Sequence, residues 1–266
     1  MRETPPESGP APAHNPSERI CVMSARVLKN GNVVFGGAGL PLISAILAQN
    51  THAPQLTILF EGGVIGPRVL PGKLPPSTNE ARCAWQASKL LSITDVLLLM
   101  QRGYVDYGFL GGAQIDRHGN LNSSYIGDPD RPKVRLPGTG GANDIASMTR
   151  VLVAMRHERR RFVERVDFVT SPGYLRGDGT RRAAGLLAGG IHLVITDLGL
   201  LDFDPRTGRM RVKALHPGVS AEEVQEKTGF ELRIPEKVPR TKPPTARELA
   251  ILRALDPERR YIAGRD

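Results

Sequence analysis

The sequence predicts an α/β fold, with an open, mostly parallel sheet that carries helices on both faces. The apolar runs are short, as in buried strands, and none approaches the roughly 20 residues that a membrane-spanning helix needs. The first runs follow one another as strand, helix and strand, an order that implies parallel neighbours. Hydrophobic residues make up 40% of the 266 residues, which is enough for a large buried core.

Residues 1–19 are expected to form a disordered tail, and residues 20–266 a single domain. The tail contains acidic residues and scattered prolines and lacks an apolar stretch, so it resembles neither a signal peptide nor a transit peptide. The rest of the chain shows no repeat, low-complexity segment or charged linker that would divide it. With two cysteines and no targeting signal, we expect a cytoplasmic protein.

The first strand, helix and strand give the sheet its predicted direction. Residues 32–35 form an apolar strand, residues 36–39 a glycine-rich turn, and residues 40–48 an apolar helix. Residues 55–60 form the next strand, which ends at Glu61. Because open α/β sheets bind ligands at the carboxyl ends of their strands, Glu61 lies where a functional site is expected.

The remaining elements alternate in a similar way. In the middle of the chain we predict an irregular segment at 64–81, a helix at 94–102 ending at Gly103, a strand at 107–115, a turn at 116–120, and a glycine-rich loop at 137–144 before another helix. In the last third we predict strands at 151–155, 166–170 and 191–196, a hairpin turn at 204–208, and two helices capped by Ser220 and Thr245.

Cysteine usage and charge exclude some classes of site. Cys21 and Cys83 are too few for a disulfide framework or for a structural zinc site with about four ligands, so no metal is expected. The 36 basic and 27 acidic residues give a net charge of +9, which raises nucleic-acid binding as a possibility. The densest basic run, residues 156–161, has no interleaved aromatics to stack bases, which favours a solvated face. Binding of an anionic ligand or of an acidic partner subunit is another explanation for the excess of basic residues.

The first glycine turn has some features of a dinucleotide-binding loop. Glu61 lies about where a ribose-binding acid would follow Gly37 and Gly39. The third glycine of that pattern, however, would fall on Leu42, whose side chain would push the helix away from the strand. Pro41 also lacks the N–H group that such loops direct at a pyrophosphate. The pattern therefore favours a structural turn between strand and helix.

Glu61 allows two interpretations. As a structural residue, its carboxylate would accept hydrogen bonds from the amides of the next turn. As a nucleophile, it would be held by a buried strand while Gly62 and Gly63 leave the neighbouring backbone bare, so that a substrate can approach. Fixed aim and steric access are what a carboxylate nucleophile needs.

The chain around Glu61 resembles the class I coenzyme A transferases, whose catalytic glutamate lies in a Ser-Glu-Asn-Gly signature. Here the signature reads Phe60-Glu61-Gly62-Gly63, so the serine and asparagine positions differ. Further segments that resemble the family, in the family's order, lie at 36–41, 103–106, 110–116, 119–120, 138–144, 196–198 and 216–219. The likeness covers residues from about 24 to 235. It is specific to the glutamate-bearing B (β) subunit, most similar to the glutaconate branch.

The resemblance implies a CoA-transferase-like fold and a heteromeric enzyme that works with a homologous A (α) subunit. It implies that Glu61 attacks an acyl-CoA and carries CoA as a glutamyl thioester, with coenzyme A as a substrate and no tightly bound cofactor. The backbone of Gly62, Gly63, Gly140 and Gly141 is expected to form the oxyanion and substrate loops, and CoA or substrate is expected at Gly37, Gly39, Gln114 and Asn143.

The carboxylic acid that exchanges CoA is expected to be a dicarboxylate such as glutaconate or a methylglutaconate, from the branch resemblance alone. Three other functions stay open. Members of the same fold hydrolyse or decarboxylate CoA thioesters, typically with the glutamate lost or replaced. A non-catalytic acyl-CoA-binding subunit is a second alternative, and a nucleic-acid binder is a third. No membrane association is expected.

Overall fold

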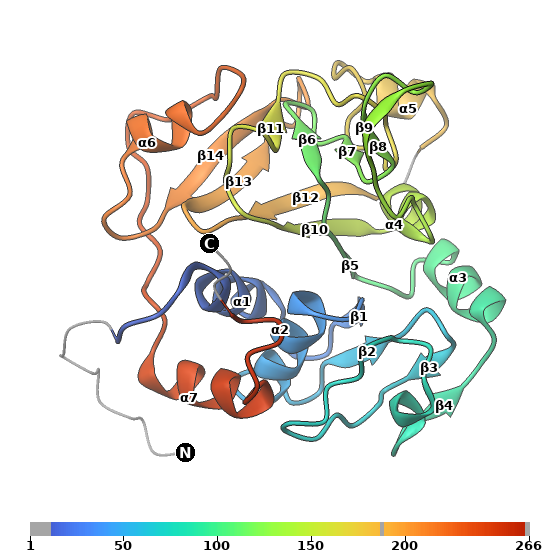
Figure 1. The fold of residues 1–266 in the computed structure, drawn as a ribbon. Coiled ribbons are helices and arrows are strands. Elements are labelled where there is room, and N and C mark those ends of the chain that lie inside the picture. Colours follow the sequence, from blue (N-terminus) through green and yellow to red (C-terminus); the bar gives the residue numbers. More distant parts are fainter. Residues whose placement is uncertain (1–11, 187–188, 264–266) are drawn as a thin grey trace.

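The computed structural model describes residues 12–186 and 189–263, and it confirms the α/β prediction. A nine-stranded sheet crosses the molecule in the order β14-β13-β12-β10-β5-β1-β2-β3-β4 (Figure 1). Its strands are β1 (Val33–Phe35), β2 (Thr57–Leu59), β3 (Val64–Ile65), β4 (Lys89–Leu90), β5 (Tyr107–Leu110), β10 (Arg150–Ala154), β12 (Gly190–Ile195), β13 (Gly199–Phe203) and β14 (Met210–Leu215).

The centre of this sheet is parallel. Strand β1 pairs with β2 on one side and with β5 on the other, and Val34 lies opposite both Ile58 and Tyr107. Strands β5, β10 and β12 continue the parallel order, whereas β3 and β4 at one edge and β13 and β14 at the other are antiparallel. The carboxyl ends of β1, β2 and β5 therefore lie next to one another.

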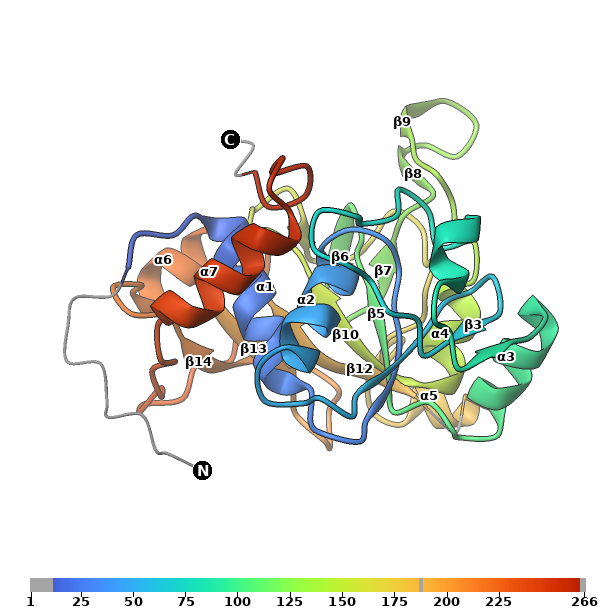
Figure 2. The same cartoon turned by 90° about the horizontal axis from the view of Figure 1, so that it is seen from below.

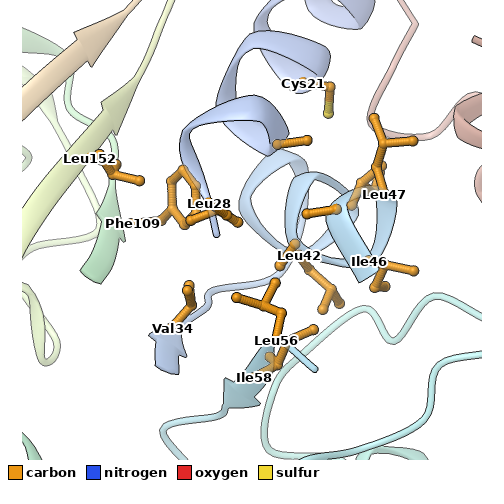
Figure 3. Close-up of a cluster of buried hydrophobic side chains, with 14 of the residues drawn as sticks. Cys21, Leu28, Val34, Leu42, Ile46, Leu47, Leu56, Ile58, Phe109 and Leu152 are labelled. Carbon is orange, nitrogen blue, oxygen red and sulfur yellow. The ribbon is translucent and has the colours of Figure 1, made fainter. Parts of the chain in front are cut away.

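Helices cover both faces of the sheet, as predicted. Helices α1 (Pro16–Val27), α2 (Leu40–Gln49) and α7 (Ala246–Leu255) pack on one face, against a cluster that includes Val34 and Ile58 (Figures 2 and 3). Helices α3 (Ile93–Gln101) and α4 (Ala142–Met148) pack on the other, against Phe35 and Leu59. Neighbouring strand residues face opposite sides because side chains alternate along a strand, so one short strand contributes to both cores.

Smaller elements surround the main sheet. A three-stranded sheet contains β6 (Gln114–Asp116), β7 (Leu121–Asn122) and β11 (Phe162–Val163), and a protruding hairpin contains β8 (Tyr125–Gly127) and β9 (Pro132–Arg135) (Figure 2). The remaining helical segments are η1 (Ala81–Ala84), α5 (Thr180–Ala183) and α6 (Ala221–Glu226). Within the described ranges, no helix is long and apolar enough to span a membrane.

The predicted disordered tail extends too far along the chain. Helix α1 begins at Pro16, where Asn15 and Glu18 form a capping box, so the prediction is wrong for residues 16–19. Glu18 is 1% exposed and accepts a hydrogen bond from Arg253 Nε at 2.7 Å. These contacts order the start of the helix against α7. Residues 1–11 lie outside the described residues, and the single-domain division of 20–266 stays a prediction.

Two predicted strands differ in the structure. Residues 166–170 do not form a strand. Asp167 instead accepts hydrogen bonds from Gly127 N and Gln114 Nε2, and Phe168 packs on the Tyr125 ring at 5.3 Å, so local contacts replace strand pairing. The predicted strand 107–115 is divided into β5 and β6. The predicted helix at 94–102 is confirmed as α3, with Gly103 beyond its end at φ +80°.

Two buried histidines lie beyond the carboxyl end of β10 and at the end of β14. The His157 ring stacks on Phe162 at 3.9 Å and lies 2.9 Å from the Thr228 hydroxyl. His216 lies 2.7 Å from the Thr241 hydroxyl. Burial lowers the pKa of His157 to about 3 and that of His216 to about 4. Both rings are therefore neutral in the folded protein at pH values where free histidine is protonated.

The free energy of unfolding should therefore fall as the pH drops from about 6.5 to about 4. In that window the unfolded chain binds protons that the folded chain does not, and each histidine contributes a slope of up to about 1.4 kcal/mol per pH unit. Urea unfolding at a series of pH values measures this slope, and His216→Gln should make it shallower. A free energy of unfolding that does not change between pH 6.5 and 4.5 would contradict the prediction.

Candidate functional site

The candidate site lies at the carboxyl edge of the parallel strands. Strands β1, β2 and β5 are adjacent in the sheet (Figure 1), and each leads directly into a loop at this edge. Strand β1 leads into the glycine turn at 36–39, and β5 leads into Gly111. Strand β2 leads through Phe60 into Glu61. Parallel pairing thus brings the predicted nucleophile beside two glycine-containing loops.

The backbone around Glu61 is fixed on both sides. Phe60 is fully buried, and its N–H donates to Val64 O at 2.9 Å while its carbonyl accepts from Gly63 N at 3.0 Å. The Glu61 side chain itself is half-buried and makes no hydrogen bond or ion pair with any described residue. The structural interpretation of Glu61, in which the next turn donates to its carboxylate, is therefore not what the structure shows.

The glycine-rich loop at residues 137–144, the second such loop in the sequence, reaches the Glu61 carboxylate. A Cβ atom at position 141 would lie 2.8 Å from Oε1 of Glu61, so only glycine allows this approach without a shift. The loop is anchored by hydrogen bonds from Gly138 N to Ser123 O at 2.8 Å and from Ala142 N to Thr139 O at 2.8 Å. The N–H groups of Gly140 and Gly141 donate to no described residue, and Gly141 is the N-cap of α4. Free N–H groups at a helix start favour negative charge nearby.

The two glycines after Glu61 have different roles. Gly63 has φ +98°, and a Cβ atom there would lie 1.9 Å from Leu91 O. Its N–H is already bonded to Phe60 O and its carbonyl accepts from Leu91 N at 2.8 Å. Gly63 is thus a structural residue whose N–H is not available to an oxyanion, which corrects its predicted place in the oxyanion set. The N–H of Gly62 donates to no described residue.

The predicted CoA or substrate residues are not equally placed. Gly37 and Gly39 lie in the β1 turn, and the space beside the Gly37 Cα is open to at least 4 Å. Asn143 lies in the first turn of α4, where its Nδ2 donates to Thr170 O at 3.2 Å. Gln114 is 6% exposed, and its amide is bonded to Asn122 and Asp167. Its side chain therefore holds the β6 region together and is not presented as a ligand-binding group.

The segment predicted as irregular, residues 64–81, lies against the turn that follows Glu61, which no sequence pattern indicated. Thr78 and Asn79 pack directly against Gly62, with the Asn79 Oδ1 atom 2.6 Å from where a Cβ at position 62 would lie. The same segment borders a cavity of about 650 Å³ whose lining includes Val69, Leu70 and Trp85, with Arg68, Lys73 and Arg82 as its basic residues. These cations are spread along the sequence, so no local motif marks them.

A larger cavity, of about 830 Å³, lies at the 116–120 turn and does not include Glu61. Its lining contains Arg117, Arg165 and Arg176 together with Asp116 and Glu164. Burial raises the pKa of Asp116, against the hydrogen bonds that it accepts from Asn120 and from the backbone. Among the residues that the structure describes, no three His, Cys, Asp or Glu side chains are grouped to hold a metal ion.

Comparison with known proteins gives a consistent match over most of the chain. Residues 17–227 match the coenzyme A transferase family. The chain is 41% identical over 246 residues to the B subunit of 3-oxoadipate CoA-transferase from Pseudomonas knackmussii, a match that covers 92% of this chain and 94% of that protein. It is 38% identical over 252 residues to the B subunit of glutaconate CoA-transferase from Acidaminococcus fermentans, with the same coverage.

Solved structures agree with the sequence match. The crystal structure of glutaconate coenzyme A-transferase from Acidaminococcus fermentans superimposes with a TM-score of 0.88 at 36% identity, over 95% of this chain and 99% of that chain. Two other similar proteins are named for activities other than CoA transfer. The decarboxylase AibA/AibB matches with a TM-score of 0.78 at 30% identity, over 92% and 96% of the two chains. The cholesterol ring-cleaving hydrolase IpdB subunit of Rhodococcus jostii is 33% identical, over 84% and 88%.

Proposed function

This chain belongs to the coenzyme A transferase family and corresponds to the B (β) subunit of its two-subunit members, and we propose that it transfers CoA through Glu61. The observation that carries the proposal is the state of the Glu61 carboxylate. It stands at a rigid strand end, free of hydrogen-bond partners among the described residues, beside Gly141. A carboxylate whose backbone is held by the sheet, but which is not itself engaged by the protein, is suited to attack a carbonyl carbon.

In the first half-reaction, a Glu61 oxygen attacks the thioester carbonyl of an acyl-CoA, and the CoA thiolate leaves. The product is an acyl anhydride on Glu61. The thiolate then attacks the Glu61 carbonyl carbon, which releases the acid and leaves CoA on Glu61 as a thioester. The released acid carries one oxygen from Glu61. CoA is therefore a substrate, and the enzyme is restored without an oxidant or a reductant.

The second half-reaction repeats these steps in reverse with an acceptor acid. The acceptor carboxylate attacks the glutamyl thioester and displaces the CoA thiolate, which gives a new anhydride. The thiolate then attacks the acceptor's carbonyl carbon, so that acyl-CoA leaves and Glu61 keeps one oxygen from the acceptor. Each addition passes through an oxyanion. We assign as its donors the free N–H groups of Gly141, which lies against the carboxylate, and of Gly140 before it.

We assign a dicarboxylic acid as the acceptor. Two of the relatives described above are named for a dicarboxylate, 3-oxoadipate in one and glutaconate in the other. Arg68, Lys73 and Arg82 supply positive charge to the cavity of about 650 Å³ that the 64–81 segment borders, which suits an anionic substrate. A panel of acyl-CoA donors with mono- and dicarboxylate acceptors tests this choice, and a preference for monocarboxylates would contradict it.

Hydrolysis or decarboxylation is the second candidate function, because similar proteins are named for these reactions. A hydrolase would open the Glu61 anhydride or thioester with water and release free CoA. The presence of an unengaged glutamate at position 61 favours transfer. Incubation with an acyl-CoA and an acceptor acid separates the reactions, since transfer yields a new CoA ester while hydrolysis yields free CoA.

The proposal includes the homologous α subunit, which serves as the partner. Between residues 70 and 104, six large hydrophobic side chains are 40% or more exposed, namely Leu70, Trp85, Leu90, Ile93, Leu98 and Tyr104. Strand β4 is the edge of the sheet, and both of its residues are exposed. Exposed apolar side chains together with an open sheet edge favour an interface with another subunit. The chemistry has the same requirement, because an anhydride must be protected from water.

Glu61→Ala should abolish transfer, with a loss of at least about 10⁴-fold in turnover, because no other group forms the anhydride. Incubation of the wild-type complex with acyl-CoA alone should build a thioester that hydroxylamine traps on the peptide containing Glu61. Glu258→Ala, an exposed control, should keep full activity. Full transferase activity of Glu61→Ala, or the label on another residue, would overturn the assignment.

Bulk at the second glycine loop should lower turnover more than substrate affinity. A Cβ atom in Gly141→Ala would displace either the Glu61 carboxylate or the N–H groups beside it, and one lost oxyanion donor typically costs about 100- to 1,000-fold in rate. Gly140→Val should act in the same direction. Ser147→Ala, at the other end of α4, is the control. Normal turnover with weakened affinity would place the loop in CoA binding.

The chain alone should be poorly soluble or self-associated and should lack transferase activity. Co-expression with the α subunit should give a soluble complex that transfers CoA. Trp85→Ser and Leu90→Glu should each weaken the complex, by at least about 30-fold if the residue is an anchor of the interface. Val134→Glu is the matched control, because Val134 is likewise an exposed apolar residue, at 48%, but lies on the β8–β9 hairpin. An isolated monomer that transfers CoA at an ordinary enzyme rate would refute the two-subunit proposal.

A further inference from the structure

Asn79 occupies the space beside the residue that follows the nucleophile. If position 62 carried a Cβ atom, that atom would lie 2.6 Å from Oδ1 of Asn79 and 3.2 Å from Thr78 O. Gly62 is not among the glycines with positive φ, so its backbone accepts any residue. A side chain at position 62 would therefore have to displace the Asn79 side chain and crowd the neighbouring carbonyl.

The Asn79 side-chain amide is not used by the fold. Its backbone N–H donates to Ser77 Oγ at 3.2 Å, but its side chain makes no hydrogen bond with any described residue. The residue is exposed at the surface of the segment, next to the turn that carries Glu61. An amide with two free N–H donors and a free oxygen, packed against the residue that follows Glu61, is available to a substrate.

Position 62 also differs from the family signature that the sequence resembles. The Ser-Glu-Asn-Gly signature that this chain resembles has an asparagine directly after the glutamate, where this chain has Gly62. Here an asparagine from another loop lies against that glycine. The two facts are independent, since one comes from the order of residues and the other from the packing of a loop further along the chain.

We propose that Asn79 is a substrate-positioning residue whose side-chain amide donates a hydrogen bond to the carbonyl oxygen of the acyl group bound at Glu61, in place of an amide at position 62. The proposal rests on the proposed role of Glu61. It extends that role by naming a group, outside the glutamate signature, that orients the acyl group for attack. Because the amide comes from another loop, position 62 needs no side chain of its own.

The test compares the complex with the α subunit in five forms: wild type, Asn79→Ala, Asn79→Asp, Gly62→Asn with Asn79→Gly, and Gly62→Ala with Asn79→Gly. Single-turnover formation of the Glu61 thioester from acyl-CoA, and the dissociation constant of acyl-CoA by calorimetry, are measured for each. Asn79→Ala should lower the rate of thioester formation by about 10- to 100-fold, the effect of one lost hydrogen bond to a reacting group. Asn79→Asp, which removes both donors, should lower it further.

The two double variants separate positioning from structure. Gly62→Asn with Asn79→Gly returns an amide to the site and should recover most of the lost rate, whereas Gly62→Ala with Asn79→Gly has a similar backbone but no amide and should not. Thermal unfolding of each variant checks that the fold is kept. Equal rates in the two double variants, or a wild-type rate for Asn79→Ala, would overturn the proposal.

The two measurements also separate a failure of the Glu61 transfer mechanism from a failure of the Asn79 proposal. If the wild-type complex forms no thioester on Glu61, the transfer mechanism fails. The acyl-CoA affinities then decide the Asn79 proposal by themselves, since they should still fall in Asn79→Ala and recover only with the double variant that restores an amide. In that case, affinities that are the same in all five forms would overturn the Asn79 proposal as well.

Discussion

The turn that carries Glu61 is held by backbone contacts that leave it almost no freedom, and the proposed chemistry depends on this constraint. Phe60 is fully buried and is bonded through both its N–H and its carbonyl. Gly63 has φ +98° and lies so close to Leu91 O that no side chain fits. The strand pairing that extends from Gly63 to the β4 edge thus fixes the nucleophile from one side. Parallel pairing of β1 with β2 and β5 fixes it from the other.

Two glutamates in this chain show how differently a fold treats a carboxylate. Burial would raise the pKa of Glu18, but hydrogen bonds from Arg253 and Asn15 and the charges of Arg253 and Arg259 lower it below its usual range. That carboxylate is fully engaged and joins α1 to α7. Glu61 has none of these partners among the described residues and is instead left beside Gly141. The first arrangement stabilises the fold, and the second leaves reactivity available to a substrate.

The position of Glu61 was predictable because it depends on local signals. A buried strand, an acidic residue at its end and two glycines are adjacent in the sequence, and the βαβ order defines the sheet edge. The strand predicted at 166–170 failed because the Asp167 side chain bonds to Gly127 N, a contact across 40 residues that no local pattern contains. The contact of Asn79 with Gly62 is of the same kind. The start of α1 was misjudged for another reason, since the prolines before Asn15 obscured a readable capping box.

The most direct test of the central claim is to follow oxygen through the enzyme. The complex with the α subunit is given acyl-CoA and an acceptor dicarboxylate labelled with ¹⁸O, in unlabelled water, and the peptide containing Glu61 is then weighed by mass spectrometry. Because each cycle leaves one acceptor oxygen on the nucleophilic carboxylate, the account predicts that Glu61 gains ¹⁸O during turnover. Rapid formation of the new CoA ester with no ¹⁸O on Glu61 would contradict it.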